Sequence, residues 1–239
     1  MNEKAQEKLH AIVKKNYTEI VDDFNETRKR HLGPLWSEVI KFAGKAKEGS
    51  SILDLGCGNG RLLQAFEDNK IIYTGIDFIP EIIEYAKKNF GNISSSVEFL
   101  TGDILELEKI GEIQEKKYDY IFCLAVLHHL PGSEVRERFL NEAKKYLKED
   151  GKILLTAWNI WGQKKFWPRL FTSSLKKVFG LYEYDFGDIF FHWKGQGLMS
   201  LRYYHAFTAG ELKRTAEKSG LKVESVFKDE FNYYLIAGK

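Results

Sequence analysis

The pattern of apolar and polar positions changes twice along the chain, and each change predicts a different kind of structure. Residues 1–48 place apolar side chains at roughly helical spacing among charges, which predicts a helical N-terminal cap interrupted at Gly33-Pro34. From Ser51 onward, short apolar runs alternate with amphipathic stretches. Strands that alternate with helices are typical of a parallel β-sheet covered on both faces.

Five apolar runs are expected to form the parallel strands, and they begin at Ser51, Ile71, Val97, Tyr118 and Gly151. Helices are expected to open near Gly60, to run from Pro80 to Gly91, and to run from about Ser133 to Glu149. A capping box, in which Thr208 precedes Glu211, predicts another helix later in the chain. The two final runs, LKVESVFK and FNYYLIAGK, are joined too briefly for a helical crossover. We therefore predict a seven-stranded, mostly parallel α/β sheet whose last strand is antiparallel.

Residues 158–206 break this rhythm and are expected to form an insertion after the fifth strand. Fourteen of the residues from 158 to 205 are Phe, Trp or Tyr, and seven cationic side chains there face only three acidic ones. We therefore divide a single domain into an N-terminal helical cap (1–48), a core (49–157), a basic aromatic insertion (158–206) and a C-terminal helix with a hairpin (207–239).

Composition narrows the possible functions. The net charge of +2 does not indicate a nucleic-acid binder, so any basic surface must be local. The two cysteines, Cys57 and Cys123, suggest neither a disulfide framework nor a zinc site, and we predict no metal. The N-terminus lacks the apolar region of a signal peptide, and no apolar run is long enough to span a membrane. These features predict a cytoplasmic protein.

The strongest chemical signal is the run DLGCGNG at residues 54–60, directly after the first strand. Glycines there let the backbone approach a ligand closely, and the turn ends where a helix should begin. The spacing is not that of a dinucleotide fingerprint, because the third glycine is misplaced. Asp77 ends the second strand, where a carboxylate can accept both hydroxyls of a ribose. Asp103 follows the third strand and is expected to lie at the same edge of the sheet.

These segments resemble the class I S-adenosylmethionine-dependent methyltransferases, a Rossmann-like family. LDLGCGNG, GID, GD at 102–103 and AVLHHL at 125–130 match that family's motifs in order and spacing. The resemblance implies S-adenosyl-L-methionine as cofactor, with Gly56 and Gly58 at its methionine part, Asp77 at the ribose and Asp103 at the adenine. The cofactor-binding residues that we predict are Arg28, Asp54, Gly56, Cys57, Gly58, Asp77, Phe78, Gly102, Asp103, Ile104 and Leu124.

Three stretches outside this core resemble one branch of that family, the tRNA wobble-uridine carboxymethyl methyltransferases of eukaryotes. They are NYTEIVDDFNETR at 16–28, GDIFFHWKG at 187–195 and RYYHAFTAGEL at 202–212. The resemblance implies that the chain methylates the carboxylate of 5-carboxymethyluridine in the anticodon loop of tRNA. It also implies that a small activator protein is a possible partner.

A carboxylate acceptor suits a site without a general base, because a group with a pKa of about 4 is already ionised at neutral pH. A planar guanidinium is the natural clamp for it, and Arg28 and Arg202 are the candidates, although Arg28 could equally bind the cofactor's carboxylate. The catalytic residues that we predict are Arg28, His128, Asp188, Arg202 and His205. Those predicted to bind substrate are Trp158, Trp193, Lys194, Tyr203 and Tyr204.

Two other functions remain open from the sequence. The aromatic insertion could enclose a small apolar acceptor, as in a small-molecule O- or N-methyltransferase. The chain could instead be a non-catalytic subunit that binds cofactor and activates a partner. The rings of the insertion are also compatible with simple core packing, and Lys164, Lys165, Lys176 and Lys177 with solvated helix faces.

Overall fold

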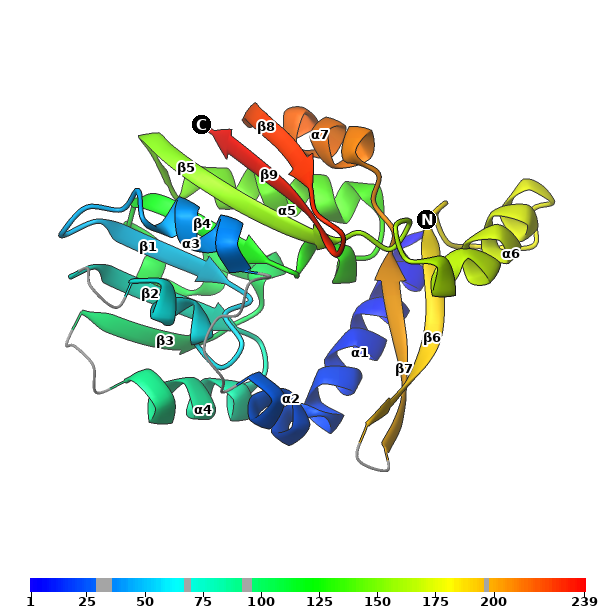
Figure 1. Cartoon of the computed structure of the whole chain (residues 1–239), viewed down its shortest axis with the longest axis horizontal. Coiled ribbons are helices and arrows are strands. Elements are labelled where there is room, and N and C mark those ends of the chain that lie inside the picture. Colours follow the sequence, from blue (N-terminus) through cyan, green and yellow to red (C-terminus); the bar gives the residue numbers. More distant parts are fainter. Residues whose placement is uncertain (29–35, 67–69, 92–95, 196–197) are drawn as a thin grey trace.

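The computed structural model describes residues 1–28, 36–66, 70–91, 96–195 and 198–239, and it is built around one seven-stranded sheet (Figure 1). The strand order is β3-β2-β1-β4-β5-β9-β8. The strands are β1 (Ser51–Leu55), β2 (Ile72–Asp77), β3 (Val97–Thr101), β4 (Tyr118–Leu124), β5 (Leu147–Trp158), β8 (Lys222–Lys228) and β9 (Asn232–Gly238). The first five pair in parallel, and β9 runs antiparallel between β5 and β8. The predicted mostly parallel sheet with an antiparallel last strand is confirmed.

Helices cover both faces of this sheet, as predicted. One apolar core contains side chains of α3 (Ser37–Ala43), the 3-10 segment η2 (Arg61–Phe66) and α4 (Pro80–Phe90). The core on the other face contains side chains of η3 (Ile104–Lys109), η4 (Gly111–Ile113), η5 (Leu127–His129), α5 (Ser133–Lys145) and α7 (Ala209–Lys218). Since the loops at the carboxyl ends of β1, β2, β3 and β4 lie on one edge, residues far apart in the sequence meet there.

Two predicted helices differ from the structure. The segment after β1 is the 3-10 turn η2 in the described residues. The helix expected to reach Glu149 ends at Lys145, because Leu147 already pairs in parallel with Tyr118 at the start of β5. Leu147 is fully buried, so its apolar side chain belongs to the core of the sheet and not to the apolar face of the helix.

The N-terminal cap consists of α1 (Glu3–Glu19), α2 (Val21–Arg28) and the later α3. The side chain of Asn2 accepts a hydrogen bond from the N–H of Ala5 and caps α1. The predicted break at Gly33-Pro34 lies outside the described residues. Leu9 and Val13 of α1 pack on Tyr203, so α1 lies between the main sheet and a separate hairpin (Figure 1).

That hairpin belongs to the insertion, which also contains η6 (Lys164–Phe166) and α6 (Trp167–Val178). Its strands β6 (Asp188–Gly195) and β7 (Leu198–His205) pair antiparallel and form a two-stranded sheet of their own. Successive side chains of a strand point to opposite faces. Arg202 and Tyr204 therefore share one face of β7, and Tyr203 and His205 share the other.

Candidate functional site

The glycine turn after β1 forms the floor of the site. Gly56 and Gly58 have positive φ values of 76° and 55°, a conformation that favours glycine. A Cβ on Gly56 would also overlap the side chain of Val126. The N–H groups of Gly56 and Cys57 donate to the carbonyl of Ile76, which ties the turn to the end of β2. At Gly56 and Gly58 the turn therefore presents backbone without a side chain to the cavity.

Two carboxylates border this turn. Oδ2 of Asp77 accepts from the N–H of Gly58 at 3.0 Å, and Oδ1 accepts from the N–H of Ile79 at 3.1 Å. Burial raises the pKa of Asp77 to about 6. Burial also favours the protonated form of Asp103, but a hydrogen bond to His10 holds the pKa of this carboxyl below its usual value. Asp77 is fixed in position, yet each of its oxygens retains lone pairs for a further donor.

A third carboxylate, Asp54, precedes the turn and also lines the cavity. Oδ2 of Asp54 accepts from the Tyr73 hydroxyl at 2.6 Å, and burial raises the pKa of Asp54 to about 7. The hydrogen bond fixes this buried carboxylate against β2.

One cavity opens over these groups and joins most of the predicted residues. The predicted cofactor-binding residues that line it are Arg28, Asp54, Gly56, Cys57, Gly58, Asp77, Phe78, Asp103, Ile104 and Leu124. Gly102 does not line it; a Cβ there would meet Ile110, so close packing explains this glycine. The bare glycine turn beside the fixed Asp77 carboxylate suits the ribose and amino acid of the predicted S-adenosylmethionine.

The far end of the cavity is lined by His128, His129, Tyr17 and Trp158. Nδ1 of His128 accepts from the N–H of Trp158 at 3.4 Å, which leaves the proton on Nε2. That Nε2 is buried and has no hydrogen-bond partner among the described residues. Burial, then the neighbouring His129, lowers the pKa of His128 well below its usual value, so the ring is neutral. His128, which lines the cavity, therefore holds a buried N–H donor for which the described residues provide no acceptor.

Two guanidinium groups, those of Arg28 and Arg61, line the cavity. Burial lowers the pKa of Arg28, and burial together with the charge of Arg28 lowers the pKa of Arg61 to about 10. Among the described residues neither of these two forms an ion pair; Arg28 lies 4.0 Å over the ring of Phe24, and Arg61 lies 4.1 Å over that of Trp36. Two buried guanidinium groups close enough for one to lower the pKa of the other favour an anionic ligand near them.

Arg202 and Tyr204 lie directly behind this wall. Nη1 of Arg202 donates to the Tyr204 hydroxyl at 2.9 Å. The ring of Tyr204 has its centroid 5.0 Å from that of His128 and 4.7 Å from that of His129. Neither residue lines the cavity, whereas Arg28 does. Burial lowers the pKa values of both histidines, and the charge of Arg202 lowers them further.

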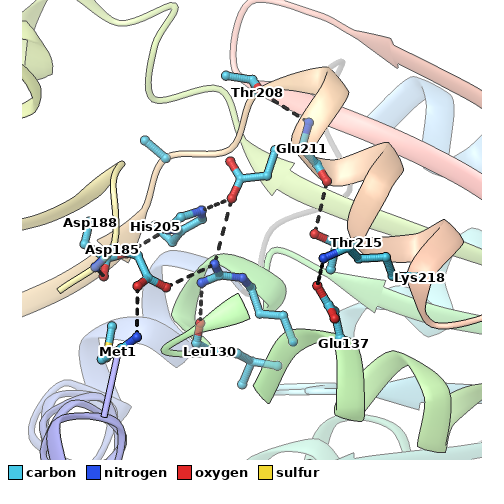
Figure 2. A network of polar contacts seen from close by, with 12 residues as sticks. Met1, Leu130, Glu137, Asp185, Asp188, His205, Thr208, Glu211, Thr215 and Lys218 are labelled. Carbon is cyan, nitrogen blue, oxygen red and sulfur yellow. Dashed lines mark hydrogen bonds and ion pairs between the residues drawn. The ribbon is translucent and has the colours of Figure 1, made fainter. Parts of the chain in front are cut away.

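Asp188 and His205 lie elsewhere, in the network of Figure 2, and Tyr203 contacts Asp188. Nδ1 of His205 lies 2.7 Å from Asp188 Oδ1, and its Nε2 lies 2.7 Å from Glu211 Oε1 (Figure 2). The Tyr203 hydroxyl also donates to Asp188, at 2.9 Å. All three predicted residues are at most 1% exposed and none lines the cavity. They were predicted to bind the acceptor or to orient it, but the structure places all three outside the cavity lining. Asp188 of β6 bonds to Tyr203 and His205 of β7, and His205 also bonds to Glu211 of α7.

Trp158 lines the cavity as predicted, whereas the side chains of Trp193 and Lys194 lie outside the described residues. Sequence reasoning missed several lining residues, among them His10, Tyr17, Arg61 and His129. Tyr17 and His129 stand within the two motifs that carried the family resemblance, and Arg61 directly follows the glycine turn. His10 carried no sequence signal, because its contact with Asp103 depends on how α1 docks.

Within the described part of the chain, no three His, Cys, Asp or Glu side chains are grouped so that they could hold a metal ion. No helix among those residues is long and apolar enough to cross a membrane.

Comparison with known proteins agrees with this geometry. The sequence profile of a methyltransferase domain matches residues 46–217. The tRNA (carboxymethyluridine(34)-5-O)-methyltransferase of Schizosaccharomyces pombe is 26% identical over 236 residues, which cover 93% of this chain and 94% of the relative. The protein of the same name from Saccharomyces cerevisiae is 31% identical over 156 residues, which cover 65% of this chain and 50% of that relative.

Solved structures share the fold. A SAM-dependent methyltransferase from Methanosarcina mazei superposes with a TM-score of 0.65 at 20% identity, covering 88% of this chain and 99% of that one. A methyltransferase solved in complex with the Trm112 activator of Haloferax volcanii superposes with a TM-score of 0.61 at 14% identity, covering 94% and 96% of the two chains.

Proposed function

We propose that this chain, which belongs to the methyltransferase-domain family and is an S-adenosylmethionine-dependent methyltransferase, methylates the carboxylate of a 5-carboxymethyluridine-type wobble nucleoside in tRNA. Both relatives described above carry that activity in their names. Their identity to this chain is moderate, so the choice of acceptor rests mainly on the chemistry of the cavity.

The observation that carries the proposal is the composition of the cavity wall, where the buried His128 and His129 lie beside each other and His129 lies beside Tyr17. Burial lowers the pKa of His128 far below its usual value and that of His129 to about 3, so neither accepts a proton readily at neutral pH. Burial raises the pKa of Tyr17 well above its usual value, so its hydroxyl stays protonated. A hydroxyl or amine acceptor would need a base at this end of the cavity. A carboxylate, ionised above a pH of about 4, needs none.

The carboxylates of the cavity are occupied at its other end. Asp77 accepts the N–H groups of Gly58 and Ile79, and Asp54 accepts the Tyr73 hydroxyl. These groups support the proposed cofactor-binding role of the turn. Asp103, held by His10 and by the N–H of Leu105, would face the adenine.

The wall residues can orient an anion without blocking its attack. When bound, S-adenosylmethionine supplies an electrophilic methyl group on a sulfonium. Arg28 and Arg61 attract the negative groups of cofactor and acceptor to the same end of the cavity, and the Nε2–H of His128 can donate to one acceptor oxygen. The packed rings of Trp158 and Tyr204 exclude water from this end.

Transfer of labelled methyl groups tests the acceptor. We expect label on tRNA that carries 5-carboxymethyluridine, none on tRNA already esterified there, and kcat nearly constant from about pH 6.5 to 9 because the acceptor is ionised throughout. Arg28→Gln should reduce kcat/KM at least about tenfold, whereas Arg138→Gln, an exposed arginine on α5, should not.

Each assay is run with the chain alone and with a co-expressed Trm112-type activator, the possible partner. Label on small carboxylic acids with none on the tRNA would contradict the proposal that tRNA is the methyl acceptor. A kcat that rises tenfold for each pH unit would contradict the proposal that the acceptor is an already ionised carboxylate.

A further inference from the structure

A second cavity of about 360 Å³ adjoins the first. Arg61, Leu124, Ala125 and Trp158 line both, so the two spaces meet at the ends of β4 and β5. The second cavity continues over Asn232, the first residue of β9, which pairs with Trp158. It is therefore the next space that an extended ligand reaches beyond the proposed acceptor.

Aromatic rings form much of the wall of the second cavity, and neighbours hold several of them in place. They belong to Trp36, Trp158, Phe231 and Tyr234. Tyr234 stacks on Phe227 with centroids 5.1 Å apart, and its hydroxyl donates to Asp229 at 2.7 Å. Trp158 is backed by Tyr204, with centroids 5.0 Å apart. Fixed rings of this kind suit a flat aromatic ligand, because little side-chain entropy is lost on binding.

The charge of the second cavity has one sign. Arg61 and Lys165 are its ionised side chains, and no carboxylate lines it among the described residues. Arg61 lies over the ring of Trp36, and Nζ of Lys165 lies 5.0 Å from the ring centroid of Phe166. Aromatic walls with cations at hand are the combination that binds single-stranded nucleic acid, by stacking on bases and by contacts with phosphates.

The chain is strained where the two cavities meet. Ala125 has a positive φ of 57°. Among the described residues, every other residue with a positive φ is a glycine. Its N–H donates to Oγ1 of Thr156 at 2.8 Å, which helps to hold this conformation. Strain of this kind is found at functional sites.

We propose that the second cavity is a nucleotide subsite, which stacks the base of the nucleotide next to the methylated one and binds the intervening phosphate with Arg61 and Lys165. The proposal rests on the proposed function, because it needs an RNA acceptor in the first cavity. It deepens that function by assigning recognition of the RNA chain, as distinct from the modified base, to these residues.

The test compares two acceptors, the 5-carboxymethyluridine nucleoside and a short anticodon-loop RNA that contains it. Phe231→Ala removes a ring that is 40% exposed, and Lys165→Gln removes a charge at the surface, so both variants should fold. We expect each to raise KM for the RNA about tenfold and to leave KM for the nucleoside unchanged. Lys164→Gln, at the neighbouring exposed lysine outside the cavity, is the matched control and should change neither.

The subsite is contradicted if KM for the RNA is unchanged in both variants. It is also contradicted if KM for the nucleoside rises as much as KM for the RNA. A second measurement separates this from failure of the proposed function: binding of the unmodified loop RNA to enzyme saturated with S-adenosylhomocysteine. If no acceptor is methylated but this RNA binds and Phe231→Ala weakens its binding, the subsite stands and the acceptor is wrong. If the RNA does not bind, or binds all variants equally, the subsite is wrong.

Discussion

The hydroxyl of Tyr17 lies 2.7 Å from Nε2 of His129, and it joins α1 to the turn after β4. Burial lowers the pKa of His129 to about 3, so the ring is neutral; it also forms a hydrogen bond with the backbone of Tyr203. Its Nδ1–H therefore donates to that carbonyl, and Nε2 accepts from Tyr17. One neutral histidine thus links the N-terminal cap, the core and β7 of the insertion at the cavity wall.

Tyr17→Phe should break this link while keeping the ring. The buried Nε2 of His129 would lose its donor, which should lower the free energy of unfolding by about 1–3 kcal/mol. We expect kcat to fall while the Kd of S-adenosylmethionine changes little, since Tyr17 lies at the acceptor end of the proposed site. Urea unfolding, turnover and calorimetry give the three quantities.

Tyr85→Phe is the matched control, because the Tyr85 hydroxyl donates to Asp22 at the protein surface. It should leave stability and turnover nearly unchanged. If Tyr17→Phe and Tyr85→Phe changed stability and turnover equally, the Tyr17–His129 hydrogen bond would have no specific role in the site.

The sequence was sufficient for those parts of the site that follow from local rules. Gly56, Gly58 and Asp77 meet because a glycine turn and an acidic strand end lie at the same edge of a parallel sheet. The contacts of Tyr17 and His10 span 112 and 93 positions, so they depend on the docking of α1, which no local pattern specifies.

The division of residues 202–205 was also not predictable from the sequence. Alternation along β7 separates Arg202 and Tyr204 from Tyr203 and His205, but it does not say which pair faces the cavity. Packing of Tyr203 on α1 and of His205 on Asp188 and Glu211 decides that question.

Cofactor affinity should depend on pH through Asp77. Burial raises its pKa to about 6 in the protein without ligand, and only the ionised carboxylate can accept both ribose hydroxyls. The calorimetric Kd of S-adenosylmethionine should therefore be constant above about pH 7 and should rise up to about tenfold per unit below pH 6. Asp77→Asn should weaken binding at every pH and remove this dependence. A wild-type Kd that stays constant to about pH 5 would contradict the assignment.

Asp54→Asn should stabilise the protein without ligand, and more so at high pH. The pKa of Asp54 is raised by burial from an ordinary 3.8 to about 7 in the folded state. The folded protein therefore binds this proton more tightly than the unfolded chain, so the stability that it contributes is present below about pH 4 and lost as pH rises to 7. Asparagine can still accept from Tyr73 and has no charge to bury.

The difference in free energy of unfolding between Asp54→Asn and wild type should grow from about pH 4 to pH 7. Its upper limit is about 4 kcal/mol, which corresponds to a shift of about three pKa units. Urea unfolding at about pH 4.5 and pH 8 measures it. An equal difference at both pH values would exclude this cause.

Glu211→Gln should loosen β7 from α7. Burial alone would favour the protonated form, but the hydrogen bond to His205 holds the pKa of Glu211 below its usual value. A depressed carboxyl pKa contributes stability above the pKa of the unfolded chain and loses it as pH falls. The variant should therefore lose about 1–2 kcal/mol near neutral pH, and less near pH 4. Turnover should fall as well, because the opposite face of β7 carries Arg202 and Tyr204 behind the cavity wall.

Glu137→Gln provides the control within the same region (Figure 2). Oε1 of Glu137 lies 3.2 Å from Nζ of Lys218, and the lysine side chain is 65% exposed. Exposed ion pairs of this kind contribute little to stability. If Glu211→Gln lowers both stability and kcat while Glu137→Gln lowers neither, β7 is positioned through His205. If Glu211→Gln lowers stability but leaves kcat and its pH profile unchanged, the network only holds the insertion together, and the acceptor wall does not depend on it.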